Sequence, residues 1–418
     1  MNAIGIAAEY NPFHNGHAFH IASARKALGA GPAGHGASPA TPPAATDTPL
    51  AATDTPPVVI ALSSSFTQRG LPAVASKAAR TAMALAGGAD LVLELPFAYS
   101  CNGGAEFARG TVALLSRFAT HISFGVEDTF DAETADKITD ILTREPPSFK
   151  LNLRENLGAG WSYPKAVAAA LEREVPGSAR VFSSPNNTLA LSYMACIKER
   201  KLPLVPLPVR RAGAAHDESA SMIRAALAAA KEFAQTLPSC VNDLMPASSL
   251  EILERERGRL VLGTKAIWAL LSAALARGGT DLRGIAGMDE GLDRLFLKGW
   301  ERSASFEDFI GRRVCARYTR GRLQRQAARV LVGLDRWTAS ALARSDPPYV
   351  RVLGFSERGR EVISARRGGV GRPQGVSRPQ GVKTVTSLRG AAKHGAMAKV
   401  CSDIERRAEM VWEIMSQV

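Results

Sequence analysis

The chain has 418 residues, which is enough for two or three domains, each with its own hydrophobic core. Its hydrophobic content of 46% and its net charge of +13, with charges of both signs, are typical of a globular protein and exclude a chain that is mostly disordered. It has no run of eighteen or more apolar residues, which argues against a transmembrane helix and a membrane partner.

The N-terminal residues are predicted to form a strand, a loop and a helix. Residues 3–8 read AIGIAA and are followed by the turn-forming residues Asn11, Pro12 and Asn15. No basic flank precedes a long apolar core, so we do not expect a secretory signal. Residues 18–28 have the composition of a helix.

Two segments of low sequence complexity are predicted to be flexible surface insertions. Residues 30–57 consist largely of Pro, Ala, Gly and Thr and contain the duplicated sequence AATDTP, and residues 368–382 repeat RPQGV. Such compositions cannot bury enough apolar surface to fold by themselves. Neither insertion is expected to carry chemistry, although the second could add loose contacts to phosphate.

Four further apolar segments are predicted to be strands of one sheet. They are Val58–Leu62, Leu91–Leu95, Ile122–Gly125 and Leu204–Leu207. Predicted helices over 72–86 and 106–118 separate the first three of them. Short strands that alternate with helices indicate an α/β fold with a parallel sheet covered on both faces, in which ligands bind at the carboxyl ends of the strands.

From about residue 220 onward the chain is predicted to be mostly helical. Val350–Phe355 is an exception that reads as a strand or a turn. We therefore predict a Rossmann-like, parallel-sheet domain over residues 1–230 and a mostly helical, basic domain over residues 231–418.

Positive charge is concentrated between residues 310 and 390. This segment has eighteen Lys and Arg and four Asp and Glu, a surplus of fourteen. A localised basic surface is expected of a protein that binds a polyanion such as nucleic acid. The alternative is an arginine bias of the coding sequence, with the arginines on solvated helix faces.

The five cysteines indicate a reduced, cytoplasmic protein. They are Cys101, Cys196, Cys240, Cys315 and Cys401. Their odd number and wide spacing, without a CxxC or Cys/His pattern, argue against structural zinc.

The strongest functional signal is His14-Asn15-Gly16-His17, after the first strand and at the start of the first helix. Both histidines can face the opening of this turn, where unpaired backbone N–H groups and the helix dipole favour an anion. Gly16 allows a phosphate to approach the backbone, and the imidazoles can donate hydrogen bonds to a leaving pyrophosphate. The alternatives are a metal-binding pair and two incidental surface histidines.

HxGH in this position resembles the signature of the nucleotidyltransferase superfamily, whose members attack the α-phosphate of ATP and release pyrophosphate. Residues 219–224 (SASMIR) resemble a second signature, in which hydroxyls cap a helix and Arg224 reaches phosphate oxygens. An ordinary capped helix is the alternative. Lys77 and Arg80 are candidates for contacts with ATP or an RNA backbone, unless they belong to a solvated face.

Blocks along nearly the whole chain resemble one family, the bacterial tRNA(Met) cytidine acetate ligases. They are EYNPFHNGH (9–17), SFTQRGLPAVASKAART (65–81), GADLVLELP (88–96), FGVE (124–127), SPNNTLALSY (184–193), RRAGAAHD (210–217), EGLDRL (290–295), YTRGRLQR (318–325) and RVLGFSERGR (351–360). Because they occur in the family's order, the resemblance is specific to the family and goes beyond the superfamily.

The resemblance implies a reaction in two steps. Acetate attacks the α-phosphate of ATP to give acetyl-adenylate and pyrophosphate, and the exocyclic amine of the wobble cytidine of elongator tRNA(Met) then takes the acetyl group. Mg²⁺ is expected to accompany ATP, because phosphoryl charge must be neutralised. No set of carboxylates in the sequence predicts a protein metal site.

The resemblance also implies which residues form the ATP site, with His14 and His17 as the catalytic pair. They are Ala7, Ala8, Glu9, Tyr10, Asn11, Pro12, Phe13, His14, Asn15, Gly16, His17, Ala18, Phe19, His20, Gly125, Asn186 and Arg211. Gly125 would permit close approach of adenosine, Asn186 could hydrogen-bond ribose or base, and Arg211 could neutralise phosphate.

The chain departs from the family's pattern at a few positions. Ser64 and Ser65 precede Phe66 where the family usually has Gly-Asn, and Ala190 replaces a usual glycine. These changes bear on the rate and acyl-group selectivity more than on the reaction class, because the HxGH loop is intact.

Two other functions are consistent with part of the sequence. A small-molecule adenylyltransferase of cofactor biosynthesis would explain HxGH but not the basic C-terminal half. An RNA-binding protein with a degenerate nucleotide site would explain the altered second block. Binding of tRNA that weakens steeply with added salt is expected of the acetate ligase and of the RNA-binding protein, but not of the adenylyltransferase.

Overall fold

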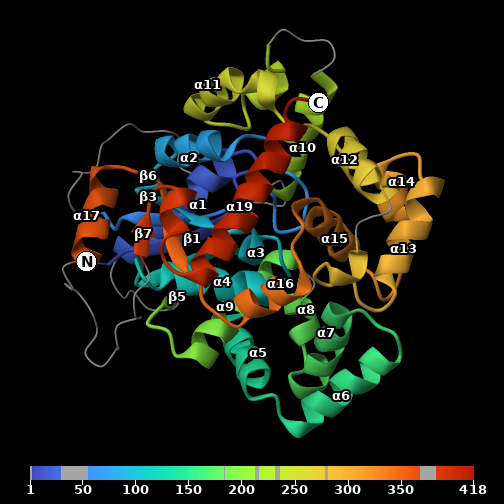
Figure 1. The fold of residues 1–418 in the computed structure, drawn as a ribbon. Coiled ribbons are helices and arrows are strands. Elements are labelled where there is room, and N and C mark those ends of the chain that lie inside the picture. Colours follow the sequence, from blue (N-terminus) through green and yellow to red (C-terminus); the bar gives the residue numbers. More distant parts are fainter. Residues whose placement is uncertain are drawn as a thin grey trace.

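A seven-stranded sheet with strand order β5-β4-β1-β2-β3-β6-β7 forms the centre of the molecule (Figure 1). The structure, a computed structural model, describes residues 2–29, 55–182, 184–211, 216–230, 236–277, 281–367 and 383–418. The predicted insertions therefore lie outside the described residues, except for 55–57. The strands are β1 (Ile4–Ala8), β2 (Val58–Ser63), β3 (Leu91–Leu95), β4 (His121–Val126), β5 (Val205–Arg210), β6 (Tyr349–Phe355) and β7 (Lys383–Val385).

The pairing of the strands confirms the predicted α/β class. β1 pairs in parallel with β2 and β4, β2 with β3, and β4 with β5. The second half of the chain extends this sheet, because β6 pairs antiparallel with β3, and β7 pairs parallel with β6. The segment predicted to be a strand or a turn is thus a strand, whereas the three-residue strand β7 was not predicted.

The apolar residues of β2 explain why the sheet is covered on both faces. All six residues of this strand are buried. Successive side chains of a strand point to opposite faces, and Val59 and Ala61 join one core cluster while Val58, Ile60 and Leu62 join another. A continuous apolar run is the pattern expected for a strand between two layers of helices.

The helices of the first half include those that were predicted, with different boundaries. They are α1 (Asn15–Gly29), α2 (Lys77–Ala86), α3 (Phe97–Ser100), α4 (Gly104–Leu115), α5 (Ala132–Arg144), α6 (Pro147–Gly158), α7 (Tyr163–Glu174), α8 (Ser178–Phe182), α9 (Pro185–Arg200) and α10 (His216–Ala230). The helix predicted over 72–86 begins only at Lys77. Pro72 bridges to Phe66, the Val74 N–H donates to Asn11 Oδ1 (2.7 Å), and Ser76 caps the helix.

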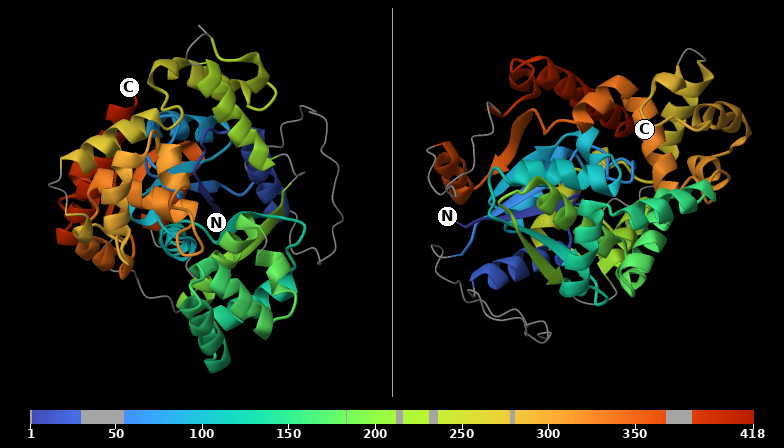
Figure 2. Two further views of the ribbon diagram at one scale, coloured as in Figure 1. Left: turned by 90° about the vertical axis from the view of Figure 1, so that its right-hand side faces the viewer. Right: turned by 90° about the horizontal axis from the view of Figure 1, so that it is seen from below.

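A third hydrophobic core lies among some of the helices of the second half, and Figure 2 shows the helices of this half in yellow, orange and red. They are α11 (Ala247–Arg255), α12 (Lys265–Ala276), α13 (Leu292–Gly299), α14 (Phe306–Gly311), α15 (Arg320–Val332), α16 (Arg336–Ala343), α17 (Glu357–Arg367), α18 (Leu388–Ala391) and α19 (Ala396–Met415), with 3₁₀ turns Ser239–Val241, Arg257–Arg259, Leu282–Gly284 and Trp300–Arg302. Phe66 and Phe97 complete this core. None of the described helices is both long and apolar enough to cross a membrane.

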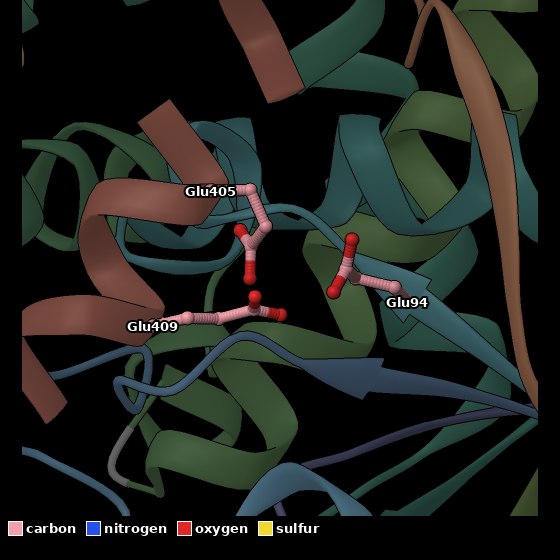
Figure 3. A group of neighbouring side chains, drawn as sticks. All are labelled: Glu94, Glu405 and Glu409. Carbon is pink, nitrogen blue, oxygen red and sulfur yellow. The ribbon is translucent and has the colours of Figure 1, made fainter. Parts of the chain in front are cut away.

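A buried ion cluster joins α19 to the sheet (Figure 3). The carboxylates of Glu94 on β3 and of Glu405 and Glu409 on α19 point toward one another. The Lys77 ammonium contacts all three, at 2.5 Å from Glu405 and 2.9 Å from Glu409. Arg351 lies 2.6 Å from Glu409 and 2.9 Å from Glu94. Because an ammonium already contacts each carboxylate, the cluster is a structural junction and not a metal site.

The structure contradicts the interpretation that Lys77 and Arg80 belong to a solvated face. The Lys77 side chain is 9% exposed, and it contacts the three carboxylates of the cluster. Arg80 is fully buried and donates hydrogen bonds to the carbonyl oxygens of Glu9 (2.9 Å) and Ser64 (2.6 Å). The Ser64 hydroxyl, at a departure from the family's pattern, donates to Glu405 (2.7 Å). These residues fix the fold behind the first loop.

Candidate active site

A cavity of about 300 Å³ opens at the carboxyl ends of β1, β4 and β5. Predicted ATP-site residues that line it are Ala7, Ala8, Glu9, Tyr10, His14, Gly16, His17, Phe19, His20, Gly125, Asn186 and Arg211. Predicted residues that do not line it are Asn11, Pro12, Phe13, Asn15 and Ala18. The fold therefore gathers most of the predicted residues around one space, from the end of β1 and the loop after it, from α1, β4 and α9, and from the residue that follows β5.

The residues of the loop that do not line the cavity hold its backbone in place. Phe13 is buried and packs edge-on against Tyr10, with 4.8 Å between ring centroids. Asn11 accepts a hydrogen bond from the Val74 N–H. The Asn15 side chain donates to the carbonyl of Asp243 (2.9 Å). These contacts are structural, so the sequence motif combines residues that face a ligand with residues that shape the turn.

The two histidines close the first turn of α1 reciprocally. The Gly16 N–H donates to His14 Nδ1 (3.1 Å), and the His14 N–H donates to His17 Nδ1 (3.2 Å). This is the pattern of a capping box, with imidazoles in place of the usual hydroxyl and carboxylate. The rings lie face to face, with centroids 3.8 Å apart and 30° between their planes. Because each Nδ1 accepts a hydrogen bond, the proton of each neutral ring lies on Nε2, and both rings line the cavity.

The backbone of this turn differs from the expectation of open N–H groups. The Asn15 N–H donates to the Leu244 carbonyl (2.9 Å), and the His17 and Ala18 N–H groups donate to the His14 carbonyl. With the two bonds of the capping box, the first N–H groups of α1 are all paired. The prediction that unpaired backbone N–H groups bind an anion here is therefore wrong, because the two histidine side chains cap the helix. Hydrogen bonds to an anion would have to come from the imidazoles.

His20 adds a third imidazole to the wall. Its Nε2 lies 2.9 Å from the Ser123 hydroxyl on β4. Burial, reinforced by the positive charge of Arg211, lowers the pKa of His20 to about 4. The ring is therefore neutral at physiological pH and adds no positive charge to the phosphate site.

Gly125, Asn186 and Arg211 meet at the far side of the cavity. A Cβ at position 125 would lie 3.1 Å from Arg211 Cγ, so the glycine makes room for this arginine. Asn186 Nδ2 donates to Glu127 Oε1 (2.7 Å), and Arg211 Nη1 lies 3.4 Å from the same oxygen. Glu127 thus orients both side chains. The sequence reasoning missed this role, although Glu127 closes the FGVE block.

Arg224 lies beside a second, larger cavity of about 960 Å³. Its Nη1 donates to the Asn11 carbonyl (2.9 Å) and its Nη2 to the Ser221 hydroxyl (3.1 Å). The expectation that the serines before it cap a helix is wrong, because α10 begins earlier, at His216. Arg224 instead fastens α10 to the loop that follows β1.

Part of the basic surplus between residues 310 and 390 is neutralised within the fold. Ion pairs join Arg312 to Asp308, Arg320 to Glu307, Arg322 to Glu290 and Arg336 to Asp289. Because these acidic partners precede residue 310, a count of charges over residues 310–390 alone leaves them out and overstates the net positive charge of this part of the fold. The predicted localised basic surface is thus smaller than the composition indicated.

Comparisons with known proteins agree with this geometry. Residues 1–33 and 49–384 match the family model described as HIGH Nucleotidyl Transferase. The tRNA(Met) cytidine acetate ligase of Acetivibrio thermocellus is 31% identical over 381 residues, which cover 87% of this chain and 85% of that protein. The protein of the same name from Syntrophomonas wolfei is 32% identical over 375 residues, covering 87% and 84%.

Solved structures show the same fold. The crystal structure of Thermotoga maritima TmcAL bound with alpha-thio ATP has a TM-score of 0.77 and 27% sequence identity, covering 96% of this chain and 90% of that chain. Its apo form has a TM-score of 0.75 and 28% identity, covering 88% and 84%. The chain belongs to the tRNA(Met) cytidine acetate ligase family of HIGH nucleotidyl transferases.

Proposed function

We propose that this chain activates acetate with ATP and transfers the acetyl group to the wobble cytidine of elongator tRNA(Met), forming N4-acetylcytidine. The observation that carries the proposal is the pair of imidazoles at the start of α1, which lie face to face and line a cavity at the carboxyl ends of the strands. The curated relatives are named for this reaction, and the Thermotoga maritima relative was solved with alpha-thio ATP.

In the first step, ATP lies in the smaller cavity with its α-phosphate against His14 and His17. Adenosine lies near Gly125 and Asn186, and Arg211 neutralises phosphate charge. An acetate oxygen attacks the α-phosphorus, the bond to the bridging oxygen breaks, and pyrophosphate leaves with the electron pair. The Nε2–H donors stabilise the charge that grows in this step.

Mg²⁺ arrives with the nucleotide. Among the described residues that line the smaller cavity, Glu9 is the one carboxylate, and its Oε1 already accepts the Gln68 N–H (2.7 Å). One carboxylate is too few for a protein-held magnesium site, whereas phosphate oxygens and water supply the octahedral shell that Mg²⁺ prefers.

We assign ATP chemistry to residues 1–230, and contacts with the tRNA outside its reacting nucleotide to residues 231–418. The residues that line the smaller cavity all lie between Ile6 and Ala220, which supports the first assignment. The remaining excess of lysine and arginine in the second half supports the other.

The function is tested by mass spectrometry of tRNA(Met) nucleosides after incubation with the protein, ATP, Mg²⁺ and acetate. We expect N4-acetylcytidine that depends on ATP and acetate, and tRNA binding that weakens steeply with added salt. Folded protein that yields no acetylated cytidine would contradict the proposal. Stable AMP transfer to a phosphorylated metabolite, without tRNA binding, would indicate an adenylyltransferase instead.

A further inference from the structure

The larger cavity adjoins the smaller one across the end of β1. Its volume is about 960 Å³, against about 300 Å³ for the smaller cavity. The two share Ala7, Ala8 and Glu9 and, from α9, Asn186, Leu189 and Tyr193. A ligand in the larger cavity therefore lies next to whatever is activated in the smaller one.

Charged side chains are few in the larger cavity. Among the described residues that line it, Glu9, Arg69 and Arg224 are the charged ones. Arg69 is exposed, and burial lowers the pKa of Arg224, while Glu9 opposes this effect and Arg69 adds to it. Two arginines with apolar and polar neighbours suit a nucleotide, because they can contact its phosphates while the other residues surround its base.

Glu9, where the two cavities meet, is held both at its carboxylate and at its backbone. Its Oε1 accepts the Gln68 N–H (2.7 Å), and its backbone carbonyl accepts a hydrogen bond from the buried Arg80 (2.9 Å). Gln68 is itself fixed, because its side chain donates to the Asn102 carbonyl (3.0 Å). The turn that carries Gln68 continues through Gly70, which has a φ of 90° and packs against the backbone of Arg325. The carboxylate is thus positioned by the fold before any substrate binds.

The imidazoles nearby cannot take a proton from a substrate in this arrangement. His14 and His17 already use Nδ1 as an acceptor of backbone N–H groups, and each Nε2 carries a proton. His20 lines the smaller cavity and does not line the larger one. Among the described residues that line the larger cavity, Glu9 is therefore the base that can accept a proton from an incoming amine.

We propose that the larger cavity receives the acceptor cytidine and that Glu9 takes the proton from its exocyclic amine during acetyl transfer. This inference rests on the proposed function. The amine nitrogen attacks the acetyl carbonyl carbon, a C–N bond forms, and the bond from that carbon to the adenylate oxygen breaks. AMP leaves with the electron pair, and the amine proton passes to Glu9 Oε2. An aromatic amine is a weak nucleophile, so removal of its proton assists the step.

The test separates transfer from activation with Glu9→Gln. The amide keeps an oxygen for the Gln68 N–H but cannot accept a proton. Synthetic acetyl-adenylate is mixed with tRNA(Met) and protein in single turnover. We expect acetyl transfer to slow about a hundredfold or more, while acetate-dependent ATP–pyrophosphate exchange changes only a few-fold.

Glu106→Gln is the matched control, because this exposed carboxylate lies on α4, two residues from the lining Gly104, without lining the cavity. It should transfer at the wild-type rate. Acetyl transfer by the Glu9→Gln variant at the wild-type rate would overturn the inference. An equal loss of ATP–pyrophosphate exchange and of acetyl transfer would also overturn it, because Glu9 would then act in the activation of acetate. Failure of the wild-type protein to acetylate tRNA would instead overturn the proposed function itself.

Discussion

Substitution of His17 by asparagine is expected to lower the rate of acetyl-adenylate formation by about 10²–10³-fold, the usual cost of losing one donor to developing charge. The asparagine carbonyl can still accept the His14 N–H, so the first turn of α1 remains capped, but the donor at the position of Nε2 is gone. Acetate-dependent ATP–pyrophosphate exchange measures this step directly.

His14→Ala should be at least as damaging, because it also removes the acceptor of the Gly16 N–H. Loss of such a cap typically costs about 1 kcal/mol of stability, which is too little to unfold the protein by itself. His394→Ala, at an exposed site on the second half of the chain, is the control and should exchange at the wild-type rate. Normal exchange in both His14 and His17 variants would refute the assigned role.

Lys77→Met is expected to destabilise the protein by about 3–5 kcal/mol, because it removes the cation paired with Glu405 and leaves Glu94 and Glu409 with Arg351 alone. The methionine fills a similar volume, so the loss reports charge and not a cavity. Unfolding in urea, followed by circular dichroism, gives the difference in free energy. Lys137→Met removes an exposed ion pair with Glu133 and should leave the midpoint unchanged.

The effect of Lys77→Met should grow with pH. Burial and then the charge of Glu405 raise the pKa of Glu94 to about 7 in the folded protein. Because this pKa is raised, the folded state binds the proton of Glu94 more tightly than the unfolded state does. The stability that protonated Glu94 contributes is therefore full below the ordinary carboxyl pKa and is lost as pH rises through about 7. Removal of the ammonium strengthens this dependence. A variant as stable as wild type at pH 8 would show that the cluster does not join α19 to the sheet.

The strands were predictable because each is a short, continuous apolar run. β3 matches its predicted boundaries, Leu91–Leu95, and β1, β2 and β4 differ by one residue at an end or at both. The partner of such a strand depends on contacts distant in sequence. The sequence therefore did not indicate that Tyr349–Phe355 extends the N-terminal sheet.

The part of the site that one short motif forms was predictable from the sequence. The part formed by residues distant in sequence was not. HxGH and its position after β1 located the cavity. The capping role of the imidazoles, the link from Glu127 to Asn186, and the burial of Lys77 and Arg80 all depend on tertiary contacts. A charged pair on a helix looks the same in sequence whether its partners are water or buried carboxylates.

The central claim is that the imidazoles at the start of α1 contact the phosphate that acetate attacks. A crystal structure with the α,β-methylene analogue of ATP tests it most directly. We predict α-phosphate oxygens within about 3 Å of Nε2 of both His14 and His17, with the base beside Gly125. An analogue bound with its phosphates away from both rings would contradict the account.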